Sequence, residues 1–499
     1  MSSRPSSREA GRRGGDLATT PGHFGGRQVL ALFIFLTSCC ALGCTHTPAR
    51  STGVVTLGLV DRGYFDYEFR EMRDRLYREF TAQTGIRVRL LPCPESAVEQ
   101  LMLWQRLLGS GPGSPQVPPD VFSVDVIWPG ILEKDLIDLK PLVAGDEAQH
   151  FPGLVANMTV GGRMVALPSR MDIGLMYYRT DLLQRYGYRA PPQTWGELES
   201  MAARIQRGER ARGNAGFWGY VWEGAISESL TCNALEWQAS EGGGVIIDAD
   251  GRVTVNNVKA IRAWERAARW VGSISPPGVT TYKESDAMNL WLSGEAAFLR
   301  HWTVGYVMSR SDNSAVKGSF GVSLLPRGEA GRAEVFGGDG YAVSRHSTHP
   351  REAVALARFL CSRKAEAMEA HDLSTPPTIP ALYADPELLA ANPQFQPVKD
   401  VVLEGMIARP STVTGEKYAE ISAAYATAVH SVLVNQVTGA VAARRLEKQL
   451  QENPGVIPPR QVAMILPNPG IHDAPCREFP LPRGGFTRRC GLGAAHETN

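Results

Sequence analysis

The sequence has little excess charge of either sign and few of the motifs that mark catalysis. Its 52 Lys and Arg residues are balanced by 51 Asp and Glu residues, which leaves a formal net charge of +1. A protein that holds nucleic acid or an anionic membrane through its overall field would carry a larger positive excess. The chain also lacks a GxSxG elbow, a P-loop and an HExxH helix, and its ten His residues are scattered. We therefore expect no catalytic residue, no cofactor, no bound metal and no nucleic-acid partner.

Long apolar runs are equally scarce. The uninterrupted run at 29–36 is too short to span a bilayer comfortably, because a spanning helix needs about 20 residues. It follows a stretch rich in Ser, Gly and Arg and precedes small residues. This order is typical of a secretory signal peptide. We therefore predict that the chain is exported.

The exit from this run resembles a bacterial lipobox, in which a cysteine after small residues receives a lipid. Two registers fit, one ending at Cys39 and the other at Cys44. Cys44 is preferred because it allows a longer apolar core and leads directly into a polar stretch. The expected organisation is a signal peptide with a basic leader over 1–44 and a linker over 45–53. The alternative is a signal peptide without a lipid, with incidental cysteines.

Cysteine is sparse in the rest of the chain. The five remaining residues are too widely spaced for a zinc site or a CxxC motif. Export permits disulfides, but an odd number cannot pair completely and the sequence does not give the pairing. We expect most of them to be buried free thiols; they are Cys93, Cys232, Cys361, Cys476 and Cys490.

Hydrophobic residues are plentiful, at 43% of the chain, and they follow an α/β pattern. Residues 54–59 and 86–91 read as strands, and apolar residues between them recur at spacings of three and four, as in an amphipathic helix. A strand, a helix and a strand in this order predict a parallel sheet. A further helix at 95–109 and a third strand at 121–126 continue the unit.

The middle of the chain carries a clear helix start. Thr194 precedes Trp195 and is followed three residues later by Glu197, which predicts a capping box opening a helix over about 195–207. Residues 453–499 are dominated by Pro, Gly and Arg and are expected to form a mobile tail. Other expected strands lie at 175–178, 319–324 and 340–344, and other expected helices near 228–240, 257–271, 284–293, 350–370 and 416–451.

Acidic, basic and aromatic residues stand at several predicted junctions between strands and loops. Carboxylates accept hydrogen bonds from sugar hydroxyls, Arg donates to them, and a flat aromatic ring covers the apolar face of a sugar. Ligands also gather at strand ends in α/β sheets. Each residue has a simpler interpretation, as a turn former, a core aromatic or half of a surface ion pair. The residues are Asp125, Asp172, Trp302, Asp339 and Arg409.

Six stretches in the same order resemble a known family. Together they look like the family 1 extracellular solute-binding proteins of ABC importers, and the branch they resemble is that of the trehalose/maltose-binding proteins. The resemblance runs from about residue 54 to about residue 450. The stretches lie at 119–128, 171–183, 191–198, 217–224, 230–237 with 242–244, and 336–343.

The resemblance implies an α/β, two-lobed periplasmic-binding-protein fold of class II. Its mixed sheets are flanked by helices, and its lobes are joined by a hinge of crossing strands. We expect one lobe at 54–170 plus about 304–342, and the other at 171–303 plus about 343–452. The expected crossings lie near 168–173, 300–304 and 339–345.

The same resemblance implies the activity and the partners. The protein would be a lipid-anchored monomer at the outer face of the cytoplasmic membrane or in the periplasm. It would bind a disaccharide or oligosaccharide between its lobes and deliver it to the transmembrane subunits of an ABC permease. The implied ligand-binding residues are Asp125, Asp172, Trp302, Asp339, Arg409, Arg170, Gly338 and Glu228.

Several positions depart from the pattern of the trehalose/maltose branch, and three of them bear on the ligand. Asp339 stands where that branch carries a tryptophan, and Arg170 and Val304 stand where aromatics are usual. The exchange of aromatics for charge indicates a more polar or differently sized ligand, and Arg170 can pair with Asp339 when no ligand is bound.

The sequence leaves two alternatives open. The same fold can bind a polyol or a phosphorylated sugar, in which case the arginines matter as anion contacts. A secreted glycoside hydrolase is the less favoured alternative, because it needs two carboxyl groups placed on either side of the scissile bond.

Overall fold

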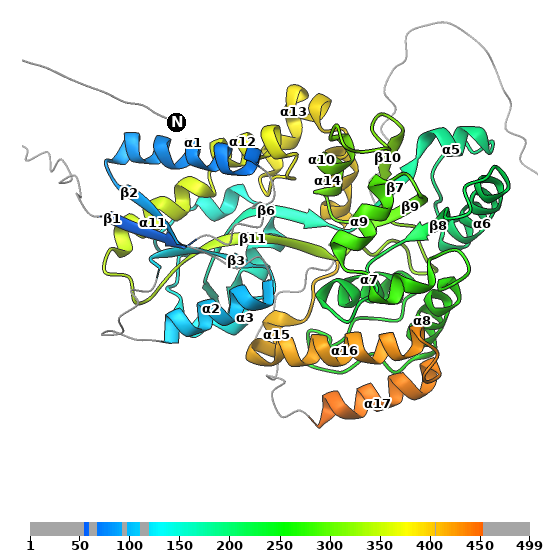
Figure 1. The fold of residues 1–499 in the computed structure, drawn as a ribbon. Coiled ribbons are helices and arrows are strands. Elements are labelled where there is room, and N and C mark those ends of the chain that lie inside the picture. The colour runs from blue at the N-terminus through cyan, green and yellow to red at the C-terminus, as the bar shows by residue number, and fades with distance from the viewer. Residues whose placement is uncertain (1–53, 59–66, 92–96, 110–118, 405, 453–499) are drawn as a thin grey trace, which may run out of the picture. The chain divides into compact units, whose positions relative to one another are not determined.

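The computed structural model describes residues 54–58, 67–91, 97–109, 119–404 and 406–452 of the 499 (Figure 1). The predicted signal peptide, both candidate lipid-bearing cysteines, the linker, Cys93, Cys476, Cys490 and the predicted tail lie outside these residues. Among the helices of the described part, none is both long and apolar enough to cross a membrane.

The first sheet has five strands in the order β2-β1-β3-β11-β6. β1 and β2 are parallel and are joined through α1, which confirms the predicted strand-helix-strand unit. β11 lies between β3 and β6 and is antiparallel to both. The bounds are β1 Val54–Gly58, β2 Arg87–Leu91, β3 Val121–Asp125, β6 Leu167–Ile173, β11 Phe336–Val343 and α1 Tyr67–Thr84.

The second sheet has four strands in the order β10-β7-β9-β8, with β8 parallel and β7 antiparallel to β9. A separate two-stranded ribbon is formed by β4 and β5. The bounds are β7 Leu175–Arg179, β8 Trp218–Val221, β9 Ala296–His301, β10 Phe320–Ser323, β4 Thr159–Val160 and β5 Arg163–Met164.

Helices pack around each sheet, as expected for the two-lobed α/β fold (Figure 1). On the first sheet, α11 packs on β3, β6 and β11, and α1 packs on α11 and α12. The bounds here are α2 Ala97–Gly109, α3 Pro129–Leu132, α4 Pro152–Asn157, α11 Pro350–Leu360, α12 Arg363–Leu373, α13 Pro386–Ala391 and α14 Phe395–Glu404.

On the second sheet, α6 and α9 pack against β8 and β9, and α7, α8, α16 and α17 pack on one another. The bounds are α5 Thr180–Arg185, α6 Trp195–Ala211, α7 Glu228–Ser240, α8 Val258–Trp270, α9 Glu284–Leu292, α10 Gly305–Arg310, α15 Ser411–Thr414, α16 Tyr418–Leu433 and α17 Gly439–Gln451.

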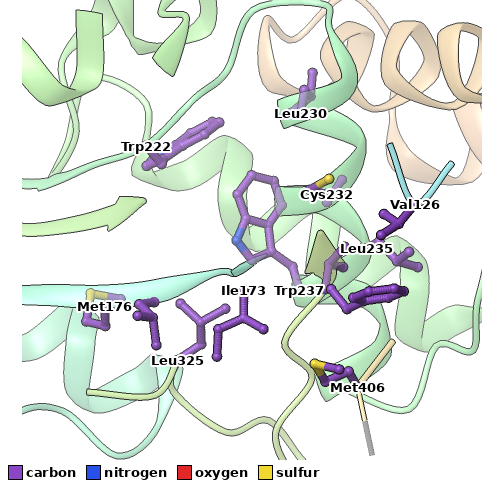
Figure 2. Packing of buried hydrophobic residues seen from close by; sticks show 14 of the residues in the cluster. Val126, Ile173, Met176, Trp222, Leu230, Cys232, Leu235, Trp237, Leu325 and Met406 are labelled. Carbon is purple, nitrogen blue, oxygen red and sulfur yellow. The ribbon is translucent and has the colours of Figure 1, made fainter. Parts of the chain in front are cut away.

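The core of the second lobe is rich in tryptophan. Trp237 on α7 lies 4.9 Å from Trp222 and 5.6 Å from Trp270, measured between ring centroids. Figure 2 shows Trp222 above Trp237, and Ile173 and Leu325 below it. All five side chains are almost fully buried, and burial of an aliphatic side chain such as Ile173 or Leu325 contributes roughly 1.5–3 kcal/mol.

The first predicted passage between the sheets, near 168–173, agrees with the structure to within one residue, but the other two predicted passages do not. The chain leaves the first sheet at Gly174, between β6 and β7, and returns between Val335 and Phe336. A third segment runs beside this return, because Phe336 donates its N–H to the carbonyl of Ile407 (3.2 Å) and Ile407 donates to that of Glu334 (2.9 Å). The segments 300–304 and 339–345 do not pass between the sheets.

The division of the later chain between lobes differs accordingly. Residues 304–342 were expected in the first lobe, but β10 pairs with β7 in the second sheet. Residues 343–452 were expected in the second lobe, but α11 and α12 pack with the elements of the first sheet. The reason is that β11 returns the chain to the first sheet, while α16 and α17 pack against α7 and α8.

The local sequence predicted where a helix begins better than it predicted where a helix is interrupted. Thr194 caps α6, since its hydroxyl accepts a hydrogen bond from the Glu197 N–H (3.2 Å), but the Glu197 carboxylate accepts from the Gln193 N–H (2.7 Å) rather than from Thr194. The helix predicted at 350–370 is divided by Cys361, and Ser362 caps the second half. The helix predicted at 416–451 is divided near Asn435, which has a positive φ.

The two cysteines within the described residues are free and buried, as predicted. Burial raises the pKa of the Cys232 thiol to about 12 and that of Cys361 well above its ordinary value. Both groups therefore stay protonated and inert at neutral pH.

Candidate ligand-binding site

The first half of β11 forms the centre of the candidate site. Gly338 has a φ of +121°, which other residues rarely adopt, and a Cβ atom there would collide with the carbonyl oxygen of Arg170. The register between β11 and β6 shifts between Asp339 and Gly340. Glycine is thus required here by both backbone conformation and close strand packing.

Asp172 and Trp302 both lie close to Gly337, the residue before Gly338. A Cβ atom built on Gly337 would lie 3.4 Å from the Trp302 ring and 3.5 Å from the Asp172 Cβ. Asp172, on β6, accepts hydrogen bonds from the Thr303 N–H (2.8 Å) and hydroxyl (2.6 Å). The carboxylate of the first sheet is therefore bound to the segment that follows β9 of the second sheet.

Arg170, Asp339 and Asp125 lie on three adjacent strands. Asp339 on β11 is opposite Arg170 on β6 and opposite Asp125 on β3. Arg170 and Asp339 form an ion pair, the pairing that the sequence allowed. Burial lowers the pKa of Arg170, but Asp339 raises it, and the net pKa lies above the ordinary value. Asp125 also holds its local turn, because its carboxylate accepts from the Ile127 N–H (3.2 Å).

Arg409 and Glu228 form a second charged pair. Arg409 donates to the Glu228 carboxylate (2.8 Å) and to the carbonyl of Phe336, the first residue of β11 (3.2 Å). Glu228 also accepts from the hydroxyls of Tyr418 and Ser422, the latter at 2.6 Å. Burial lowers the pKa of Arg409, but neighbouring acidic groups outweigh it, so the pKa is raised and the guanidinium stays charged.

Seven of the eight predicted binding residues thus lie on or beside the first half of β11, and the eighth, Glu228, contacts it only through Arg409. Sequence reasoning missed Thr303, Glu284 and Arg300, which contact Asp172 or Trp302. Glu284 lies 18 residues before Trp302, and the sequence does not show that the two are in contact. Arg300 is fully buried, which the sequence does not show for a charged residue.

A cavity of about 590 Å³ lies at a different place. None of the eight predicted residues lines it. Its walls come mainly from α10, β10 and the segment before α14, and include Tyr306, Arg310, Lys317, Phe320 and Gln394.

Comparison with known proteins identifies the family. Residues 64–367 match the family model described as bacterial extracellular solute-binding protein. The chain belongs to this family. The solute-binding protein is 43% identical over 370 residues to a probable ABC transporter-binding protein of Deinococcus radiodurans, a match that covers 74% of this chain and 87% of the relative.

Solved structures agree with the fold of this solute-binding protein. The maltose-bound MalE3 protein of T. maritima superposes with a TM-score of 0.71 at 33% identity, covering 80% of this chain and 98% of that one. A solute-binding protein of Agrobacterium vitis with bound D-mannitol has a TM-score of 0.64 at 18% identity, covering 80% and 97%. The two-lobed fold predicted from the sequence is confirmed, and the relatives are binding proteins.

Proposed function

We propose that this solute-binding protein binds a trehalose- or maltose-like carbohydrate between its two lobes and delivers it to the permease of an ABC importer. The observation that carries the proposal is the meeting of Trp302, Asp172 and Gly337 at one point. There an indole ring and an aspartate side chain border Gly337, which has no side chain of its own. The 33%-identical relative that holds maltose supports this substrate class.

The chemistry of the cluster suits a neutral polyhydroxyl ligand. The indole offers an apolar face to the C–H groups of a sugar ring, and carboxylates accept from its hydroxyls. Arg170 and Arg409 are each paired with a carboxylate, so neither guanidinium offers an uncompensated charge to a phosphate. A polyol remains the second candidate, because the ion pair at 170 and 339 makes the site more polar than two aromatics would.

The test is a binding screen of the protein from residue 45 onward. A ligand that binds only the folded state at 100 times its Kd stabilises that state by about 2.7 kcal/mol. We expect a rise in melting temperature with maltose or trehalose, followed by calorimetric titration of the responding sugar. If phosphorylated or acidic solutes raise the melting temperature and neutral sugars and polyols do not, the proposal is wrong.

The site is tested by Trp302→Ala, with Trp218→Ala as the matched control. Both tryptophans are partly buried and have a guanidinium carbon 4.3 Å from the ring centroid, but Trp218 stands on β8 at the edge of the second sheet. We expect the first variant to raise the Kd of the sugar about 30-fold, because buried aromatic anchors contribute about 2 kcal/mol or more. The control should leave the Kd unchanged.

We also propose that the protein is exported and anchored by a lipid on Cys44, with Cys39 as the alternative, and acts as a monomer without catalysing a reaction. The support is the order of basic, apolar and small residues before Cys44. Mass spectrometry of the mature N-terminus should find a diacylglycerol-modified cysteine at one of these positions. An unmodified N-terminus would contradict the anchor, and turnover of the bound sugar would contradict a purely binding role.

A further inference from the structure

Trp302 is held by groups from three different elements. Its indole N–H donates to the carboxylate of Glu284 on α9 (2.8 Å), and the hydroxyl of Tyr177 on β7 donates to its carbonyl (2.7 Å). The guanidinium carbon of Arg300, two residues earlier on β9, lies 4.3 Å from the centroid of its ring. One edge of the indole and one region of its π surface are therefore already engaged by the protein.

Arg300 is itself fixed in a fully buried ion cluster. Its Nε and Nη2 donate to the two carboxylate oxygens of Glu236 (2.9 and 2.5 Å), and its Nη1 donates to Glu223 (3.3 Å). None of the three side chains is exposed to solvent. A bidentate pair fixes the plane of the guanidinium as well as its position, which a packed apolar side chain does not do.

The same cluster touches two of the passages between the sheets. Glu236 accepts from the N–H of Val335, directly before β11 (3.4 Å). The N–H of Gly174, between β6 and β7, donates to the carbonyl of Val335 (3.4 Å). A Cβ atom on Gly174 would collide with the Glu236 carboxylate and with Nη2 of Arg300, so only glycine lets this passage lie against the ion pair.

We infer that Glu284, Arg300 and Glu236 are positioning residues for Trp302, and that the Arg300–Glu236 pair couples the indole to the two passages at Gly174 and Val335. The functional part of this inference rests on the proposed role of Trp302 in ligand binding. A displacement of the passages would move Glu236, and through Arg300 it would move the ring against which the ligand stacks. Ligand stacking would in turn favour one arrangement of the passages.

The positioning role is tested without any ligand by ¹⁹F NMR of the purified protein labelled with 5-fluorotryptophan. Trp302→Phe assigns the resonance of Trp302. We expect Glu284→Ala and Glu236→Gln each to shift or broaden this resonance, and Glu284→Gln to leave it in place, because the amide oxygen still accepts from the indole. If Glu236→Gln does not fold, Arg300→Lys takes its place. Lysine keeps the positive charge but cannot form the two parallel hydrogen bonds of the guanidinium.

The matched control is Glu241→Gln. Arg266 donates to Glu241 (2.5 Å), and its guanidinium carbon lies 5.7 Å from the ring of Trp195 and 5.9 Å from that of Trp270. This variant should move the resonances of those two tryptophans and leave that of Trp302 unchanged. The inference is overturned if Glu284→Ala leaves the Trp302 resonance unchanged. It is also overturned if Glu236→Gln, or Arg300→Lys used in its place, leaves that resonance unchanged.

The coupling to binding is then measured with maltose as the probe. Glu284→Ala and Glu236→Gln should raise the Kd for maltose about fivefold or more, whereas Glu284→Gln and Glu241→Gln should change it less than about twofold. Equal affinities in all four variants would overturn the coupling. If the unaltered protein binds neither maltose nor any other neutral sugar, the proposed function fails, while the NMR result still decides whether these residues position the ring.

Discussion

Glu223 is a buried carboxyl group that accepts hydrogen bonds from two side chains. Its carboxylate accepts from the amide of Asn233 (2.6 Å) and from Arg300 (3.3 Å). Arg300 already has a closer carboxylate in Glu236, so two carboxyl groups share one guanidinium. Burial, which the attraction of Arg300 only partly offsets, raises the pKa of Glu223 to about 7. The group therefore gains and loses its proton near neutral pH.

This pKa makes stability depend on pH. Because the pKa in the folded state lies above the ordinary value of 4.5, Glu223 contributes stability that is complete below about pH 4.5 and is lost as the pH rises through about 7. The loss is on the order of 3 kcal/mol, at about 1.4 kcal/mol per pKa unit. Urea unfolding of Glu223→Gln should therefore show a smaller decline in stability between pH 5 and pH 8 than the unaltered protein.

A second buried carboxyl group, Glu334, does not affect the comparison between Glu223→Gln and the unaltered protein. Burial raises the pKa of Glu334 to about 8 as well, and it is present in both proteins. Identical dependence of unfolding free energy on pH in the two proteins would show that Glu223 does not titrate in this range.

The residues of the site differ in how far the sequence reveals them. Asp172 and Trp302 are visible as a carboxylate and an aromatic at strand ends, and the resemblance to a family places them together. Thr303 is not visible, because it lies 131 residues from Asp172 and its role depends on the strand pairing that brings the two together. The sequence suggests that Arg300 is exposed, since arginine is almost never fully buried unless it is paired, but Arg300 is fully buried.

At the scale of elements, the start of α6 shows what a single capping residue contributes. Thr194→Ala removes the acceptor for the Glu197 N–H and should lower the free energy of unfolding by about 1 kcal/mol. Ser227→Ala is the control, because Ser227 stands at the N-cap of α7 but its hydroxyl donates to the Ala225 carbonyl (3.1 Å) instead of capping. Urea titration should give a smaller loss for the control, and equal losses would count against the cap.

Helix starts were predictable because they depend on neighbouring residues, whereas sheet partners were not. Ser362 lies inside a continuous helical pattern, and its action as a cap for α12 becomes visible only once Cys361 ends α11. β10 reads as a strand in the sequence, but its pairing with β7 is a contact between distant segments. A periodic pattern gives the type of an element and leaves its partners open.

At the scale of the whole molecule, the near-zero net charge gives the protein little long-range attraction for a charged solute. A neutral sugar bound by hydrogen bonds and stacking should therefore keep its affinity in salt. We expect the Kd for maltose to change less than about twofold between 20 and 500 mM NaCl, since salt screens only charge-charge interactions. Calorimetric titration checks this, and a steep loss of affinity with salt would indicate an anionic ligand.

The division into lobes was the part of the fold that the sequence predicted least well. The presence of two lobes follows from the family resemblance, but the points where the chain passes between them depend on which sheet each strand joins. Gly174 and Val335 carry no local signal of this kind. Their role emerges from the pairing of β11 with both β3 and β6.

The position of β11 also bears on the order in which the chain can fold. Every strand of the second sheet precedes β11 in the sequence, yet β11 is an inner strand of the first sheet, between β3 and β6. The first lobe therefore cannot be completed during synthesis until the strands of the second have been made. Such non-local pairing slows folding. β3 and β6 consequently stay incompletely paired until β11 has been synthesised.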